Sequence, residues 1–229
     1  MWARIVNAVQ ARSFAEVGVF RGHFAEQVLK DCESIDQYYM IDPWRDLDDW
    51  NKPANRSDRE FTEIKSEALS RTEFASDKRI ILQGKTTEVS SEIPDDSLDF
   101  VYIDGDHTLR GIAIDLIRMW PKIKEGGVVA GDDFCSSIWQ HDKKYEPTLI
   151  FPFAVYFAEA HGTTICGLPF NQFAILADTS SGGAFAFHDM TGKYHSTELR
   201  EALSIPPSHS IFGRSLRKFK RAIAAIRSR

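Results

Sequence analysis

Five short apolar runs recur along the chain, and each leads abruptly into glycine or aspartate. The runs are SFAEVGVF (13–20), QYYMIDPW (37–44), RIILQG (79–84), LDFVYIDGD (98–106) and GGVVAGDDF (126–134). Segments with helical spacing of apolar residues separate them, as across residues 109–120. Strands that are apolar throughout and alternate with helices form parallel sheets covered by helices on both faces. The sequence therefore predicts a doubly wound, Rossmann-like α/β fold.

The alternation of strand and helix changes near residue 163. Two apolar segments, 163–169 and 172–177, are separated by only a few residues, Phe170 and Asn171 among them. Such a short link permits a hairpin but not the crossover that joins parallel strands. We therefore expect the sheet to acquire an antiparallel strand late in the chain.

Two segments fall outside the alternation and are rich in aromatic, proline and charged residues. They are residues 43–57 and 134–152. Both follow the ends of predicted strands, the side on which doubly wound sheets hold their ligands. We interpret them as lids over a ligand site, with plain surface loops as the alternative. The predicted domain spans residues 1–200, and residues 201–229 form a C-terminal extension with a basic tail.

The charge of the chain is unevenly distributed. The net charge is −5, yet residues 213–229 hold seven lysines or arginines and no acid, so the rest of the chain is acidic. An acidic body argues against binding to nucleic acid, which requires a basic surface. The basic tail fits either an amphipathic helix that touches an anionic membrane or a solvated, flexible end.

Cysteine content and hydropathy indicate a cytoplasmic protein. The three cysteines Cys32, Cys135 and Cys166 form no C-x-x-C pair, which is typical of reduced thiols and not of a disulfide framework or a zinc site. No apolar run approaches the roughly 18 to 20 residues that a membrane span needs. The N-terminal segment also lacks the pattern of a cleavable secretory signal.

The first strand leads into a glycine turn, EVGVFRG (16–22), of the form E-x-G-x-x-x-G. Glycine lets the backbone turn sharply and lets a ligand approach the main chain, and the helix start behind it presents free N–H groups. A tight strand-to-helix turn needs glycine in any case, and the third glycine of the dinucleotide fingerprint is missing. Asp42 ends the second strand, where it either accepts both hydroxyls of a ribose or caps the strand.

Carboxylates follow the fourth and fifth strands where each strand ends. Asp104 follows one strand, and Asp132 and Asp133 follow the next, which is its neighbour in a doubly wound sheet. Like charges in a small space repel, and a divalent cation such as Mg²⁺ removes that repulsion by taking oxygen ligands. The alternative is that these acids cap helices or face water, the role that we assign to Asp106. His107 could accept a proton at neutral pH, and the alternative is that it faces solvent or caps the following helix.

Taken together, these segments resemble the class I S-adenosylmethionine-dependent methyltransferases, and most closely the bacterial branch that methylates oxygen atoms of small molecules and sugars. The resemblance spans about residues 13–178 and rests on EVGVFRG, YMIDPW, the late hairpin and, above all, the block from YIDGDH to GGVVAGDD. It implies a seven-stranded sheet of order 3-2-1-4-5-7-6 with one antiparallel strand. It offers no secure counterpart for the two lids or for the residues after about 178.

The resemblance also implies a role for each matching position. The implied cofactor-binding residues are Glu16, Gly18 and Gly22 for the methionine moiety and sugar, Asp42 for the ribose, and Gly84, Lys85 and Thr86 for the adenine. In metal-dependent relatives, one carboxylate after the fourth strand and two consecutive ligands after the fifth bind Mg²⁺, which implies Asp104, Asp132 and Asp133. The first two ligands there have the same separation of 28 residues. Some sugar-modifying relatives place a catalytic histidine where His107 stands.

The resulting hypothesis is methyl transfer from S-adenosylmethionine to a hydroxyl group of a small acceptor, such as a sugar or a secondary metabolite, assisted by Mg²⁺. The metal held by Asp104, Asp132 and Asp133 would act as a Lewis acid. His107, or else Asp104, would remove the proton of the acceptor. Three alternatives stay open: a metal-dependent glycosyltransferase that uses residues 104–106 as a D-x-D motif, an NAD-dependent Rossmann oxidoreductase, and a non-catalytic binding protein on the same scaffold.

Overall fold

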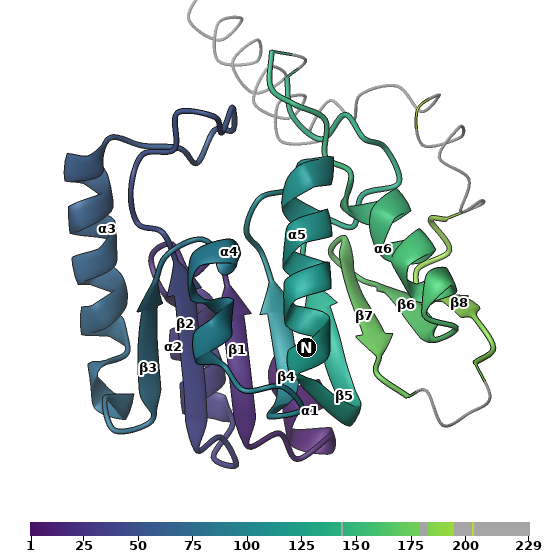
Figure 1. Ribbon diagram of the computed structural model, residues 1–229, viewed down its shortest axis with the longest axis horizontal. Helices are drawn as coiled ribbons and strands as arrows, with labels where there is room; N and C mark the ends of the chain where they lie inside the picture. Colours follow the sequence, from purple (N-terminus) through teal and green to yellow (C-terminus); the bar gives the residue numbers. More distant parts are fainter. Residues whose placement is uncertain (143, 179–182, 195–202, 204–229) are drawn as a thin grey trace, which may run out of the picture.

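Eight strands form a mixed sheet in the computed structural model, which describes residues 1–142, 144–178, 183–194 and 203 (Figure 1). Their order across the sheet is β3-β2-β1-β4-β5-β7-β6-β8. The strands are β1 (Ser13–Val17), β2 (Gln37–Asp42), β3 (Arg79–Gln83), β4 (Leu98–Ile103), β5 (Ile123–Gly131), β6 (Thr164–Leu168), β7 (Gln172–Leu176) and β8 (Ala186–Asp189).

Helices cover both faces of this sheet (Figure 1). Residues of β1 alternate between the two layers, since Phe14 joins one apolar core and Ala15 and Val17 join the other. The sheet is therefore buried on both faces, as the apolar runs predict. One face carries α1 (Trp2–Ala8), α2 (His23–Asp31) and α3 (Asp58–Arg71), and the other carries α4 (Thr86–Val89), α5 (Leu109–Met119) and α6 (Ile150–Ala160).

The predicted strand order is confirmed. Strands β1 to β5 are parallel, and β1 lies between β2 and β4, so the direction in which strands are added reverses at β1. β7 runs antiparallel to both β5 and β6. The prediction of seven strands is one too few, because β8 pairs with β6 at the edge of the sheet. This strand is short and not fully buried, so it lacks the apolar signal of the others.

The start of the fifth strand also differs from the prediction. The sequence pattern places it at the glycines 126–127, but β5 already begins at Ile123. Leu98 of β4 pairs with Ile123, and the register shifts before Phe100 pairs with Val128. The two glycines therefore lie inside an irregular part of the strand, where a β-bulge interrupts the regular pairing.

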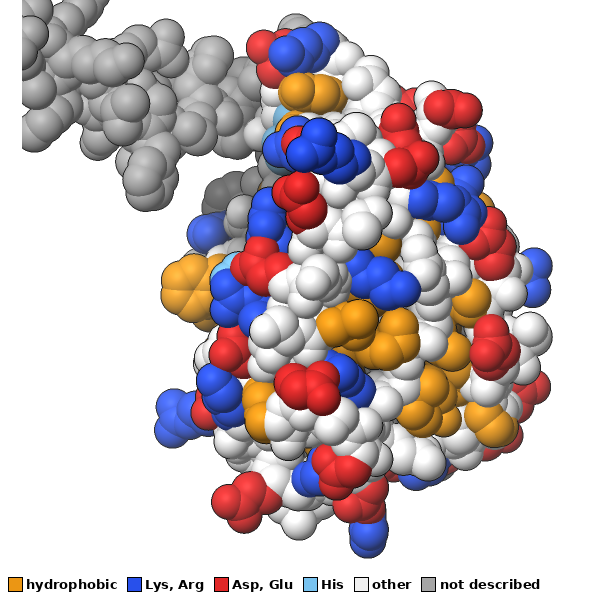
Figure 2. Space-filling model, turned by 90° about the vertical axis from the view of Figure 1, so that its left-hand side faces the viewer, with side chains coloured by type: hydrophobic (Ala, Val, Ile, Leu, Met, Phe, Trp, Pro, Cys, Tyr) orange, Lys and Arg blue, Asp and Glu red, His pale blue; other side chains and the backbone are white. Residues whose placement is uncertain are grey.

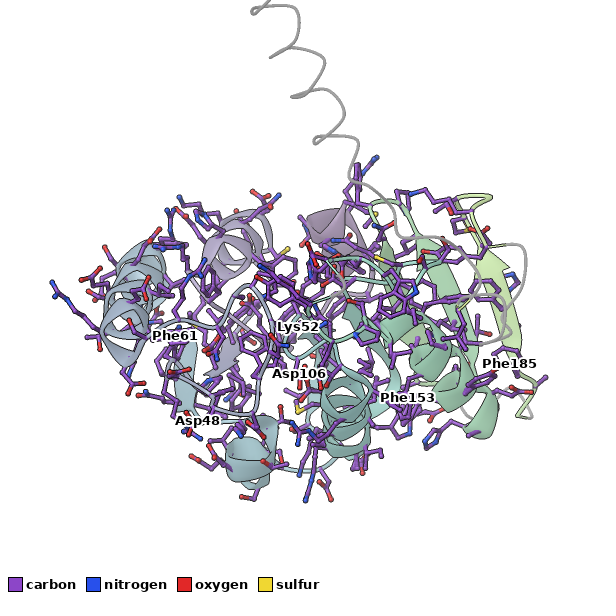
Figure 3. The ribbon with its side chains drawn as sticks, turned by 90° about the horizontal axis from the view of Figure 1, so that it is seen from above. Asp48, Lys52, Phe61, Asp106, Phe153 and Phe185 are labelled. Carbon is purple, nitrogen blue, oxygen red and sulfur yellow. The ribbon has the colours of Figure 1, made fainter. Side chains whose placement is uncertain are left out.

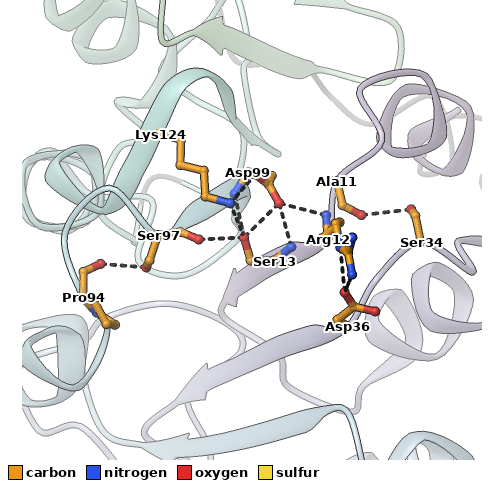
Figure 4. Close-up of polar contacts among 9 residues, drawn as sticks. All are labelled: Ala11, Arg12, Ser13, Ser34, Asp36, Pro94, Ser97, Asp99 and Lys124. Carbon is orange, nitrogen blue, oxygen red and sulfur yellow. Dashed lines mark hydrogen bonds and ion pairs between the residues drawn. The ribbon is translucent and has the colours of Figure 1, made fainter.

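A polar cluster joins β1, β4 and β5 at the edge of the sheet where the parallel strands begin (Figure 4). One carboxylate oxygen of Asp99 accepts hydrogen bonds from the backbone N–H groups of Arg12, at 2.8 Å, and Ser13, at 2.9 Å. Its other oxygen lies 2.6 Å from the Lys124 ammonium. Each charge and each backbone donor of the cluster thus has a partner, which indicates a structural role.

Charged side chains of both signs are interspersed on the side of the molecule that α3 forms (Figure 2). Arg71 of α3 lies 2.8 Å from Glu26 of α2 and 2.7 Å from Glu67 within α3. Arg21, in the turn before α2, also pairs with Glu67. These ion pairs join the two helices across the surface.

Some sequence predictions fall outside the described residues. The basic segment 213–229 lies there, and so does the boundary near residue 200. Among the helices within the described ranges, none is both long enough and apolar enough to span a lipid bilayer.

Candidate active site

A cavity of about 520 Å³ lies where the parallel strands end. Ligand sites of doubly wound sheets lie at this edge, next to the point where the strand order reverses, and the volume is in the range of small-molecule sites. The ends of β1, β2 and β4, the starts of α4 and α5, and parts of segments 43–57 and 134–152 line it. The cavity thus collects side chains from regions that are far apart in the sequence.

Asp42, the last residue of β2, fixes two of the loops around the cavity. Its carboxylate accepts hydrogen bonds from the backbone N–H groups of Phe20 and Trp44, each at 2.8 Å. Both of these residues have a positive φ, 48° and 39°, a conformation that non-glycine residues adopt only where the surroundings enforce it. Burial raises the pKa of Asp42. The aspartate lines the cavity and shapes the turns on either side of it.

Gly18 lines the cavity and needs to be glycine for two reasons. Its φ is +90°, and a Cβ there would lie 2.1 Å from the carbonyl oxygen of Asp104. The end of β1 therefore approaches the end of β4 more closely than any side chain permits. Gly22, which caps α2, is instead packed against α3, because its Cβ would lie 2.9 Å from the Cα of Ala68. Gly22 is not among the residues that line the cavity.

Glu16 lies behind the cavity wall and is also not among the lining residues. It is 1% exposed, and its carboxylate accepts a hydrogen bond from the Tyr38 hydroxyl at 2.7 Å. Burial raises the pKa of Glu16 to about 8, although the Tyr38 hydrogen bond opposes the shift. The acid of the E-x-G-x-x-x-G turn is thus a buried group whose carboxyl is protonated at neutral pH.

Gly84, Lys85 and Thr86 line the cavity where α4 begins, next to the end of β2. The backbone N–H of Gly84 donates to the carbonyl of Asp42 at 3.1 Å. The Thr86 hydroxyl donates to Asp115 of α5 at 2.6 Å. Sequence reasoning assigned no role to Asp115, although an acid among the apolar, buried positions of a helix was a signal that could have drawn attention to it.

The strand-end acids converge on His107. Its Nε2 lies 3.3 Å from Asp104 Oδ1, and its Nδ1 contacts Asp133 Oδ2. One ligand atom from each of these three residues lies within 4.8 Å of the other two. Asp133 has a positive φ of 58°, and Gln140 of segment 134–152 donates to its other oxygen. The geometry thus brings together an imidazole and two carboxylates from the ends of neighbouring strands.

Asp132 stands apart from this cluster. Its carboxylate accepts a hydrogen bond from the backbone N–H of Asp133 at 2.8 Å, and it is neither among the lining residues nor part of the three-residue group that could hold a metal ion. Burial, together with the nearby charge of Asp104, raises the pKa of Asp132 to about 7. The predicted role of Asp132 as a metal ligand stays a prediction.

Electrostatics explains why two acids can lie so close together. Burial alone would lower the pKa of His107, but its hydrogen bonds to Asp104 and Asp133 outweigh burial and raise the pKa to about 10. The protonated ring in turn lowers the pKa of Asp133, against the opposite effect of burial. In this arrangement the imidazolium offsets the repulsion between the carboxylates, the role that a bound cation would otherwise have.

Asp106 was expected to cap a helix or to face water, and it lies just before α5, whose N-cap is Thr108. It accepts hydrogen bonds from the backbone N–H of Thr108 and from the indole N–H of Trp50, each at 3.0 Å. Thr108 itself caps the helix, since its hydroxyl accepts from the N–H of Gly111 at 3.1 Å. Asp106 therefore also fixes segment 43–57 to the wall of the cavity.

Segments 43–57 and 134–152 meet over the cavity. The buried ammonium of Lys52 donates to the carbonyl of Glu146 at 2.8 Å, and the Asn51 amide donates to the carbonyl of Lys144 at 2.9 Å. Lys52 lies near Asp106 when the molecule is seen from above (Figure 3). Sequence reasoning did not single out Lys52, because a lysine in a polar segment is ordinarily a solvated surface residue.

The chain is similar to known methyltransferases in sequence and in fold. A family model described as a methyltransferase domain matches residues 15–134, and no curated protein sequence matches the chain. Several solved structures share the fold. A putative caffeoyl-CoA O-methyltransferase from Staphylococcus aureus has a TM-score of 0.58 at 14% identity, over 76% of this chain and 79% of that one. A Corynebacterium glutamicum protein has a TM-score of 0.55 at 15% identity, over 78% and 81%.

A third similar structure is an O-methyltransferase from Bacillus cereus in complex with SAH, with a TM-score of 0.50 at 14% identity, over 76% of this chain and 78% of that one. The family match begins within β1, ends just after the acids that follow β5, and covers more than half of the chain. It therefore includes every strand end that lines the cavity. The chain belongs to this methyltransferase-domain family, and its sheet is that of the class I S-adenosylmethionine-dependent methyltransferases.

Proposed function

We propose that this methyltransferase transfers the methyl group of S-adenosylmethionine to a hydroxyl oxygen of a small acceptor, such as a sugar or a secondary metabolite. The observation that carries the proposal is a single cavity with two different ends. One end has Asp42 beside the start of α4, and the other has Asp104, His107 and Asp133. The first end suits a nucleoside and the second suits the activation of a hydroxyl group. Two of the similar structures are described as O-methyltransferases.

The nucleoside end offers contacts for the cofactor. Asp42 would accept hydrogen bonds from the ribose hydroxyls, and residues 84–86 would lie beside the base. Gly18 lines the cavity at the end of β1, so its backbone would face the methionine moiety. Glu16 and Gly22 do not line the cavity, so their proposed role is to shape the wall behind the cofactor.

The other end has a donor set that fits a divalent cation. Asp104 and Asp133 supply carboxylate oxygens, which Mg²⁺ prefers, and His107 lies between them. When bound, the cation would stabilise negative charge that develops on the acceptor oxygen and would replace the imidazolium as counter-charge to the carboxylates. Asp132 is one residue away and keeps its predicted place as a further ligand.

His107 would act as the general base. In its neutral form, Nε2 would accept the proton of the acceptor hydroxyl on the side of Asp104, whose side chain is 40% exposed and therefore open to a ligand. The acceptor oxygen would then take the methyl group from the sulfonium, which leaves as the neutral thioether of S-adenosylhomocysteine. Because no covalent enzyme intermediate is needed, alignment of the two substrates would supply much of the acceleration. The segments that meet over the cavity would exclude water.

The test combines binding with turnover. Titration calorimetry with S-adenosylmethionine and S-adenosylhomocysteine establishes the cofactor, and labelled S-adenosylmethionine with a panel of hydroxylated acceptors, with MgCl₂ or EDTA, establishes the reaction. We expect Asp133→Asn and His107→Ala to lose at least about 100-fold in turnover while binding S-adenosylhomocysteine within threefold of wild type, roughly. Asp95→Asn, an exposed acid far from the cavity, should leave both unchanged.

Two results would contradict the proposal in different ways. If the protein binds neither S-adenosylmethionine nor S-adenosylhomocysteine, the proposed methyl transfer is wrong. If Asp133→Asn methylates an acceptor as fast as wild type, or if wild type is as fast in EDTA as in MgCl₂, these carboxylates do not hold a cation that assists the reaction. Turnover of nucleotide sugars without methyl transfer would instead favour the glycosyltransferase alternative.

A further inference from the structure

Asp115 is a buried acid that the reaction described above does not use. It lies on α5, is 6% exposed, and lines the cavity. Its Oδ1 accepts a hydrogen bond from the Thr86 hydroxyl at 2.6 Å. Its Oδ2 lies beside the backbone of Gly105, since a Cβ placed on that glycine would be 3.1 Å from Oδ2. The side chain therefore reaches the cavity wall between the starts of α4 and α5.

The carboxyl group of Asp115 is short of partners. Within the described part of the chain, Oδ2 accepts no hydrogen bond, and Thr86 is the one donor to the group. Burying a carboxyl group is costly unless its oxygens are hydrogen-bonded. In line with this, burial raises the pKa of Asp115 to about 7, although the Thr86 hydrogen bond opposes the shift. An acceptor that the fold leaves unmatched at a cavity wall is suited to a donor on a ligand.

The position of Asp115 indicates that it would contact the base of the cofactor. The methyl group must be delivered at the end formed by Asp104, His107 and Asp133. With the ribose held at Asp42, the base of the cofactor would lie away from that end, toward α4 and α5. The N–H of Gly84 bonds to the carbonyl of Asp42, which places the start of α4 directly beside the ribose site.

The surroundings of Asp115 suit a flat, largely apolar ring with a polar edge. Ile41 and Ile114 contribute apolar surface to the cavity, and residues 84–86 contribute backbone. Thr86 directs its hydroxyl at Asp115 and not at the ligand. Oδ2 of Asp115 is thus the acidic acceptor at the nucleoside end that the described residues leave available.

We propose that Oδ2 of Asp115 accepts a hydrogen bond from the exocyclic amino group of adenine, and that Asp115 thereby selects an adenosyl cofactor over one with a different base. Thr86 acts as a positioning residue that holds the carboxyl group in place. The proposal rests on the proposed function, because it assumes an adenosyl cofactor in this cavity.

The experiment compares two ligands by titration calorimetry: S-adenosylhomocysteine, and S-inosylhomocysteine, in which a carbonyl replaces the amino group. A hydrogen bond to a charged group is worth roughly a 10- to 100-fold change in affinity, so wild type should bind the adenosyl ligand that much more tightly. Asp115→Leu should bind the two ligands within about threefold of each other. Thr86→Val removes the hydroxyl that positions the carboxyl group, so it should reduce the preference without abolishing it. Asp95→Asn, at an exposed acid outside the cavity lining, is the control and should keep the full preference.

The outcomes separate the two proposals. Wild type that binds both ligands equally overturns the assignment of Asp115 without the need for any variant, so a variant that fails to fold does not block the test. An Asp115→Leu protein that is weakened equally toward both ligands, with the preference intact, also overturns it and leaves a structural role. Wild type that binds neither ligand overturns the proposed cofactor, and this inference with it.

Discussion

The buried pair of Glu16 and Tyr38 makes the stability of this protein depend on pH. Glu16 is almost fully buried in β1, and its carboxyl accepts the Tyr38 hydroxyl. Burial raises the pKa of Glu16 from its ordinary 4.5 to about 8. Between these two values the folded protein holds a proton that the unfolded chain has released. The contribution of Glu16 to the free energy of unfolding is therefore fully present below pH 4.5. It decreases as the pH rises from there and is lost as the pH passes about 8, where the folded carboxyl ionises.

The magnitude follows from the same two values. Each pKa unit corresponds to about 1.4 kcal/mol, so Glu16 should remove about 3 to 4 kcal/mol of unfolding free energy between pH 5 and pH 8. This loss is a large share of the roughly 5 to 15 kcal/mol that stabilises a typical domain. In Glu16→Gln the amide cannot ionise and has nearly the same shape. The variant should match wild type within about 1 kcal/mol at pH 5 and exceed it by about 3 kcal/mol at pH 8.

Urea unfolding followed by tryptophan fluorescence, at pH 5, 6, 7 and 8, measures both proteins. Glu63→Gln is the matched control, because the Glu63 side chain is 71% exposed on α3. Its stability should follow the wild-type pH dependence. If the Glu16→Gln and wild-type curves stay parallel across this range, the buried carboxyl does not take up a proton on folding, and the argument from burial is refuted.

Two further changes test the packing around the strands by urea unfolding. Gly18→Ala should cost about 3 kcal/mol or more, because its Cβ would clash with the carbonyl of Asp104 at a positive φ; Gly126→Ala, also at a positive φ but with open space around it, should cost about 1 kcal/mol. Equal losses would rule out the clash. Asp99→Ala should cost about 2 to 3 kcal/mol by leaving two backbone N–H groups without acceptors, whereas Asp36→Ala removes only an exposed ion pair and should cost less than about 1 kcal/mol.

Much of the fold could be predicted because burial leaves a local trace in the sequence. A strand covered on both faces is apolar throughout, so β1 to β5 were recognisable, and the short link at 169–171 indicated the hairpin of β6 and β7. β8 is only partly buried and has no such trace. The irregular start of β5 depends on its register with β4, which is a property of the pair and not of either segment.

The candidate site could be predicted in part. The acids at 104, 132 and 133 were expected to meet, because parallel strands end at one edge of a sheet. The structure brings Asp104 and Asp133 together at His107 and leaves Asp132 outside that group. Glu16 and Gly22 are not among the residues that line the cavity, because Glu16 is buried against Tyr38 and Gly22 packs against α3, and their contacts with the cofactor stay a prediction. Side-chain direction at the end of a strand depends on the turn that follows, and a motif does not record it.

The sequence by itself determined a parallel, doubly wound sheet and the edge that carries polar groups, since periodicity and strand-end composition are local properties. Only the tertiary structure decided which neighbouring acid joins His107: the positive φ of Asp133 directs one carboxylate to the ring, and Asp132 remains outside the cluster. It also decided that Thr86 meets Asp115 and that Lys52 joins the two segments over the cavity. Such contacts depend on how helices and loops pack across the sheet, which no local pattern encodes.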